Sequence, residues 1–129
     1  MAQPSDRFYT KEHEWVKIDG QNGVIGITDH AQSALGDIVY VELPKVGASL
    51  DQGKPIGVIE SVKAVSDIYA PISGTVIEVN SSVVDDPAKV NGDPFGDGWL
   101  VKVDVADAGQ SKQLLDAAAY DALVEAESH

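Results

Sequence analysis

The chain has 129 residues, 43% of them hydrophobic and 23% charged, which predicts a single globular domain over residues 1–129 with a real hydrophobic core. Asp and Glu number 21 against 9 Lys and Arg, and the formal net charge of −12 argues against binding nucleic acid or an anionic membrane through charge. The sequence contains no cysteine, so disulfides, thiolate metal sites and cysteine nucleophiles are excluded.

Residues 1–7 are expected to form a loose N-terminal tail. They lack the apolar run of a signal peptide and the Arg-rich amphipathic character of an organelle transit peptide. No stretch of the sequence approaches the roughly 20 apolar residues of a membrane span. We therefore expect a bacterial protein of the cytoplasm.

The first part of the ordered chain alternates short apolar segments with turn-forming residues. Thr28 or Asp29 can cap a short helix, and Gly36 can end it. In chain order we expect ordered chain from 8–10, a strand over 14–18, a turn over 19–23, a strand over 23–27, a helix over 30–35, a strand over 37–42 and a bend over 46–53 with a short extended piece.

Residues 53–80 predict three strands joined by two turns. The apolar, β-prone segments are 56–59, 65–70 and 75–79, and the turns fall at 61–64 and 72–74. The first turn contains no Gly, Asn or Pro, which a type I turn does not require. Lys63 stands at its tip, so its ammonium should project into water from a backbone that is braced on both sides.

The last part of the chain predicts a loop or one helical turn over 81–90, an irregular segment over 91–98 and a strand over 99–105. Ser111 is expected to cap a C-terminal helical segment over 111–128 with one broad apolar face. That face contains Leu114, Leu115, Ala118, Ala119, Leu123 and Val124. Many short strands with helices only as an insert and at the end predict a mainly β barrel or sandwich.

The segment around Lys63 resembles the lipoyl-lysine hairpin of glycine cleavage system H-proteins. The resemblance lies in residues 60–64, Glu-Ser-Val-Lys-Ala, in the following Ser66 and Asp67, and in the turn at 70–74. Blocks at 9–10, 12–16, 26–28, 31–32, 35–39, 41–44 and 98–99 look like those of the same family, in its order. The resemblance implies a flattened β-barrel/sandwich of the lipoyl/biotinyl-domain type, a barrel-sandwich hybrid.

The resemblance also implies a carrier and not an enzyme. Lipoate would be attached to Lys63 by a lipoate ligase or lipoyl transferase. A pyridoxal-phosphate glycine decarboxylase would load an aminomethyl group, a tetrahydrofolate-dependent aminomethyltransferase would take up the one-carbon unit, and a dihydrolipoyl dehydrogenase with FAD and NAD would reoxidise the dithiol. We expect a monomer that binds neither nucleic acid nor membrane.

Four acidic or polar residues are candidates for flanking the lipoyl arm. The resemblance implies that the loaded arm folds back into a surface cleft with Glu14 and Asp67 on its border. Glu60 and Ser61 stand three and two residues before Lys63 in the sequence. An amine held beside a carboxylate and away from water should release ammonia more slowly. Glu12 is interpreted as an ordinary surface acid.

No catalytic or metal-binding constellation is expected. His13 and His30 lie far apart in the sequence, without a third ligand at a recognised spacing, so we predict no metal site. No nucleophile elbow supports a serine triad, and no phosphate-binding loop follows the glycines of 91–98.

Three alternatives compete with the H-protein interpretation. Biotin carriers flank their lysine with methionines, whereas Val62 and Ala64 flank Lys63, and lipoyl domains of 2-oxo acid dehydrogenases more often have Asp before the lysine. An unmodified structural barrel would leave Lys63 bare. Within the family, the alternative function is a lipoyl relay that donates lipoyl groups to other lipoyl domains.

Overall fold

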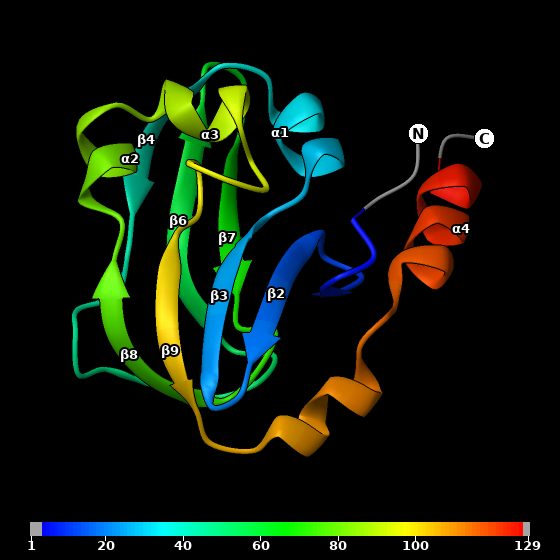
Figure 1. The fold of residues 1–129 in the computed structure, drawn as a ribbon. Coiled ribbons are helices and arrows are strands. Elements are labelled where there is room, and N and C mark those ends of the chain that lie inside the picture. Colours follow the sequence, from blue (N-terminus) through cyan, green and yellow to red (C-terminus); the bar gives the residue numbers. More distant parts are fainter. Residues whose placement is uncertain (1–3, 128–129) are drawn as a thin grey trace.

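Strands dominate the fold over residues 4–127, which are the ones that the computed structural model describes (Figure 1). The strands are β1 (Phe8–Tyr9), β2 (Glu14–Asp19), β3 (Asn22–Ile27), β4 (Ile38–Glu42), β5 (Ser49–Leu50), β6 (Pro55–Ser61), β7 (Val65–Tyr69), β8 (Gly74–Val79) and β9 (Val101–Val105). The helical segments are α1 (Asp29–Leu35), α2 (Ser81–Asp85), α3 (Ala88–Gly92), the 3₁₀ helix η1 (Ala108–Gln113) and α4 (Ala117–Glu127).

These strands form two antiparallel sheets. One has the strand order β1-β2-β3-β9-β8-β5 and the other the order β4-β6-β7. The two sheets do not join into one closed barrel, which is the arrangement of a flattened barrel-sandwich. The predicted mainly β class, with a short inserted helix and a C-terminal helix, is therefore confirmed.

Local sequence explains the individual elements. β9 alternates buried valines with the more exposed Lys102 and Asp104, as a strand with one buried face requires. β2 and β3 are joined by a tight turn between the paired residues Asp19 and Asn22. Gly20 in that turn has a φ of 64°, a conformation that glycine adopts without steric cost.

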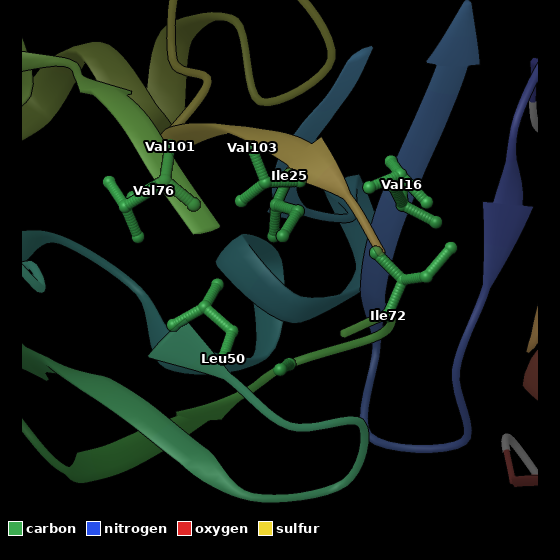
Figure 2. Packing of buried hydrophobic residues seen from close by; sticks show 9 residues of the cluster. Val16, Ile25, Leu50, Ile72, Val76, Val101 and Val103 are labelled. Carbon is green, nitrogen blue, oxygen red and sulfur yellow. The ribbon is translucent and has the colours of Figure 1, made fainter. Parts of the chain in front are cut away.

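The core lies between the two sheets. Figure 2 shows part of it, with the labelled side chains, from Val16 on β2 to Val101 and Val103 on β9, turned toward a common interior. A second cluster joins β3 to the small sheet through Ile27, Ile59 and neighbours. Leu43 and Ile56 pack against both clusters, so the apolar interior is continuous. Each fully buried Val or Ile side chain contributes about 1.5–3 kcal/mol.

The helical inserts were predicted in part. Thr28 is the residue that caps α1, since its Oγ1 accepts the Ala31 N–H at 3.2 Å, and Gly36 ends the helix with a φ of 78°. The expected loop or single turn over 81–90 is instead two single-turn helices, α2 and α3, on either side of Asp86-Pro87. The last strand begins at 101 and not at 99.

The prediction that Ser111 caps a continuous C-terminal helix is wrong. Ser111 lies inside η1, and α4 begins after Asp116, whose Oδ1 accepts the Ala119 N–H at 2.8 Å. Between them, Leu115 pairs with Tyr9 through two backbone hydrogen bonds of 2.8 Å, which pulls the chain out of helical geometry. This pairing covers the edge of β1, and the apolar face of α4 turns its buried Tyr120 toward it.

The N-terminal tail is anchored at its last residue. Residues 1–3 of the expected loose tail lie outside the described residues, but the Arg7 guanidinium stacks 4.5 Å from the centroid of the Trp15 ring and donates to the Phe95 carbonyl at 3.0 Å. From residue 4 to residue 127, no helix has the length and the apolar character needed to cross a membrane.

Candidate functional site

Lys63 lies at the tip of the β6–β7 hairpin, as predicted. The Ser61 N–H donates to the Ala64 carbonyl at 2.8 Å, and the Ser61 hydroxyl oxygen accepts the N–H groups of Lys63 and Ala64 at 3.3 and 3.1 Å. Lys63 is exposed, and its ammonium has no hydrogen-bond or ion-pair partner among residues 4–127. Ser61, a candidate for contacting the arm, therefore has a local role in holding the turn.

The tip is also braced from outside the hairpin. The Val62 N–H donates to the Asp37 carbonyl at 3.1 Å, and Gly36 lies against the Lys63 side chain, where an added Cβ would be 3.6 Å from the lysine Cε. In Figure 1 the hairpin tip stands at the same end of the molecule as α1 and α3. The backbone that carries the amine is thus fixed, while the amine itself is free to move.

Asn91 of α3 connects the elements around the tip, and sequence reasoning missed it. Its Oδ1 accepts the Ile38 N–H at 2.9 Å, and its Nδ2 donates to the Gln32 side chain at 2.9 Å and to the Gly36 carbonyl at 2.8 Å. One side chain therefore ties α1, the start of β4 and α3 together. An asparagine among turn formers has no local signal for such a role.

A small hollow lies along β7 on the buried side of the hairpin. It has a volume of about 30 Å³, room for a group about the size of a water molecule or an amine. Its lining consists of Glu12, Glu14, Ser66 and Asp67 together with the apolar residues Ile27, Ala31, Leu35, Ile59 and Ile68. At about 3.3 Å per strand residue, Asp67 lies at most roughly 13 Å along the chain from Lys63.

Glu14, like Glu12, lines both this hollow and a larger open cleft of about 610 Å³. Its side chain is only 2% exposed, and its carboxylate accepts hydrogen bonds from the Thr10 hydroxyl at 2.6 Å and from the Tyr69 N–H at 3.3 Å. Burial raises the pKa of Glu14 to about 7, although both hydrogen bonds favour the charged form. The carboxyl group can therefore gain or lose a proton near neutral pH.

The structure separates the predicted arm-flanking residues into two groups. Glu14 and Asp67 share the hollow, together with Glu12, which sequence reasoning had treated as a surface acid. Glu12 lies in the turn before β2, where strand alternation gives no signal for its position. Glu60 lines neither the hollow nor the open cleft. It pairs with Tyr40 on one side and Val65 on the other in the small sheet, and its side chain lies on the face opposite the buried Ile59.

Apolar side chains are exposed around the hairpin tip. Val62 and Val65 are 70% and 67% exposed, and Val39 and Tyr40 on the neighbouring β4 are 55% and 46% exposed. Clusters of exposed apolar residues mark sites of interaction with other proteins. The surroundings of Lys63 therefore suit an amine that is presented to partner proteins.

The two histidines, which lie apart in the sequence, are neighbours in the structure. The ring centroids of His13 and His30 are 4.6 Å apart, and Glu127 reaches both rings from α4. Sequence spacing carries no signal for this cluster, because its members come from the two ends of the chain.

Comparison with known proteins identifies close relatives over almost the whole chain. A sequence model of the glycine cleavage H-protein family matches residues 7–127. The chain is 52% identical to the glycine cleavage system H protein of Myxococcus xanthus over 122 residues, which are 95% of each chain. It is 55% identical to that of Beutenbergia cavernae over 127 residues, which are 98% of this chain and 100% of the relative.

The fold is also similar to a solved structure. The crystal structure of a glycine cleavage system H protein from Mycobacterium marinum superposes with a TM-score of 0.89 at 43% sequence identity. The match covers 95% of this chain and 99% of that one. Sequence and fold therefore point to the same family.

Proposed function

The chain belongs to the glycine cleavage H-protein family, and from this premise we propose that its lipoyl group is attached to Lys63. The role of the family, and of this chain, is that of the lipoyl carrier in the glycine cleavage system. The observation that carries the proposal is the exposed amine of Lys63 on a hairpin tip fixed from both sides. A ligase can reach such an amine, and the rigid tip fixes the point from which an arm moves.

The bound group would supply what the chain lacks. The sequence has no cysteine, and the lipoyl dithiolane provides the sulfur that accepts and releases the aminomethyl group. The chain itself contributes an attachment point, an apolar contact surface around it and a polar hollow nearby. We therefore assign the chain a carrier role and no catalytic step of its own.

We further propose that Glu14, together with Asp67 and Glu12, receives an amine in the hollow. An ammonium lowers the pKa of a carboxyl group beside it. An incoming ammonium would therefore draw Glu14, whose pKa burial raises to about 7, into its charged form. Buried surroundings strengthen that attraction and keep water away from the amine. Ser61 and Glu60, which do not line the hollow, are not part of this proposal.

The partners follow from the family. We propose a pyridoxal-phosphate glycine decarboxylase, a tetrahydrofolate-dependent aminomethyltransferase and a dihydrolipoyl dehydrogenase, with a lipoate ligase or lipoyl transferase to modify Lys63. The exposed apolar side chains of Val39, Tyr40, Val62 and Val65 would form part of their shared contact surface. The bacterial cytoplasm stays the predicted compartment.

The attachment site can be tested by intact mass and peptide mapping of protein from a host that makes lipoate and the ligase. We expect one lipoyl increment, on the peptide that contains Lys63. Lys63→Arg should carry no increment and should abolish glycine-dependent activity in the reconstituted system, because guanidinium is not an acylation target. Lys54→Arg, which replaces another exposed lysine, should keep both.

A lipoyl increment on another lysine, or normal activity of Lys63→Arg, would contradict the assignment. Transfer of the lipoyl group itself from Lys63 to another lipoyl domain would support the relay alternative. The role of the hollow is tested separately, by the rate at which loaded protein loses ammonia. Glu14→Gln and Asp67→Asn should lose ammonia faster than Glu60→Gln, the matched acid on the opposite face of the hairpin.

A further inference from the structure

Three side chains from distant parts of the chain meet on the side of the molecule where α4 packs. His13 lies in the loop before β2, His30 in the first turn of α1 and Glu127 at the end of α4. The Nε2 atoms of His13 and His30 lie 3.0 and 3.7 Å from Oε1 of Glu127, and one potential ligand atom from each residue lies within 4.8 Å of the others. Nothing in the carrier function uses this cluster.

The backbone holds His13 in an unusual conformation. Its φ of 72° places it in the left-handed region, which is uncommon for a residue other than glycine. Its N–H donates to the Thr10 carbonyl at 3.2 Å, and its carbonyl accepts the Thr28 N–H at 3.0 Å. Such strained conformations cluster at functional sites, and here the conformation directs the imidazole toward α1 and α4.

A hydrogen-bonded chain behind the ring sets its orientation. Nδ1 of His13 lies 2.8 Å from the Tyr120 hydroxyl, which lies 2.6 Å from the hydroxyl oxygen of Thr28. Both hydroxyls can donate, so Nδ1–H can donate to Tyr120 while Tyr120 donates to Thr28. Nε2 then presents its lone pair to the cluster, in the way that metal-binding histidines are oriented by a second group.

The residue types and spacing match the ligands of one class of cation. We propose that His13, His30 and Glu127 bind a divalent transition metal, with zinc as the type case, and that the metal fastens α4 to α1 and to the loop before β2. Two imidazoles and a carboxylate suit zinc, whereas magnesium and calcium prefer oxygen ligands. Three protein ligands leave a fourth tetrahedral position for water.

The carboxylate is already placed for shared binding, and the two imidazoles, whose ligand atoms lie within 4.8 Å of each other, would move closer together. Ligand atoms about 2.0–2.2 Å from a tetrahedral zinc lie about 3.3 Å from each other. The two distances of 3.0 and 3.7 Å to Oε1 of Glu127 bracket that value. The side chains of His13, His30 and Glu127 are 18%, 29% and 40% exposed, so the metal can enter from solvent and the chain's net charge of −12 attracts it.

The test is zinc titration of the untagged full chain by calorimetry, together with cobalt absorption spectra. We expect one zinc per chain, a rise in Tm on zinc addition and the intense visible bands of tetrahedral cobalt. His30→Gln and Glu127→Gln should each weaken zinc binding at least tenfold. Tyr120→Phe, a positioning variant, should weaken it about tenfold, because second-shell partners contribute 10–100-fold to affinity.

Two matched controls should keep wild-type affinity. His129→Ala removes the third histidine of the chain, and Glu125→Gln removes another exposed acid of α4. His30→Gln alters a partly exposed side chain on a surface helix, and circular dichroism and metal-free Tm verify that each variant is folded. The result does not depend on lipoate, since it can be measured on the unmodified chain.

Several outcomes would overturn the proposal. Wild-type protein that binds no zinc would mean that His13 and Glu127 form an ion pair and nothing more. Equal affinity in wild type, His30→Gln and Glu127→Gln, or loss of binding with His129→Ala alone, would place the metal elsewhere. Cobalt spectra typical of an octahedral ion would contradict the tetrahedral site.

Discussion

Glu14 is a buried carboxyl whose replacement by glutamine should change how stability depends on pH. Glutamine has the shape of a protonated glutamate, with one acceptor and one donor. Its single oxygen can accept only one of the two donors, the Thr10 hydroxyl or the Tyr69 N–H. Its amide cannot replace the other contact, because the Thr10 hydroxyl oxygen already accepts the N–H groups of Glu12 and Glu14. The lost contact lowers the stability of the variant equally at every pH, so the change of the difference with pH isolates the effect of the charge.

The sign follows from the raised pKa. Burial moves the pKa of Glu14 from an ordinary value of 4.5 to about 7 in the folded protein. Between these values the folded state binds a proton that the unfolded chain has lost, so this group's contribution to stability falls as pH rises and levels off above about 7. At about 1.4 kcal/mol for each pH unit, the whole window corresponds to about 3 kcal/mol.

The assay is urea unfolding of wild type and Glu14→Gln at pH 5, 6, 7 and 8. We expect the free energy of unfolding of the variant, relative to that of wild type, to rise by about 2.5 kcal/mol from pH 5 to pH 8. Glu42→Gln, which replaces an exposed acid of β4, controls for the general loss of one negative charge.

A difference between wild type and Glu14→Gln that stays constant from pH 5 to pH 8 would refute the reasoning. That result would mean that the hydrogen bonds from Thr10 and Tyr69 outweigh the burial of the charge, and that Glu14 is ionised throughout.

Three further changes test the hairpin and its support. Lys63→Arg should lose lipoyl loading yet keep its free energy of unfolding within about 0.5 kcal/mol, because the side chain is exposed; a larger loss would show a structural role. Gly57→Ala should cost about 1–3 kcal/mol in urea unfolding, since its Cβ would overlap the Glu42 carbonyl, whereas Gly92→Ala meets nothing within 4 Å and should be neutral or slightly stabilising. Similar values for the two alanine variants would contradict this packing. Asn91→Ala should cost about 1–3 kcal/mol and speed hydrogen exchange in residues 36–38, and unchanged exchange there would argue against its bracing role.

The sequence by itself determined the features that depend on neighbouring residues. Alternating side chains predicted the strands, the Asp19–Asn22 turn and the hairpin with Lys63 at its tip, because period, turn chemistry and exposure are local properties. Thr28 was one of two candidates for capping α1, and only the structure chose it. The family resemblance was also readable, since its blocks are ordered along the chain.

Only the tertiary structure decided features that join distant segments. Leu115 leaves helical geometry because β1, over 100 residues earlier, offers its backbone as a partner. The raised pKa of Glu14 and the contact between His13 and Glu127 also arise where segments distant in the sequence pack together. Burial and electrostatic contact depend on distance in space, and spacing along a chain specifies that distance only within a single element of secondary structure.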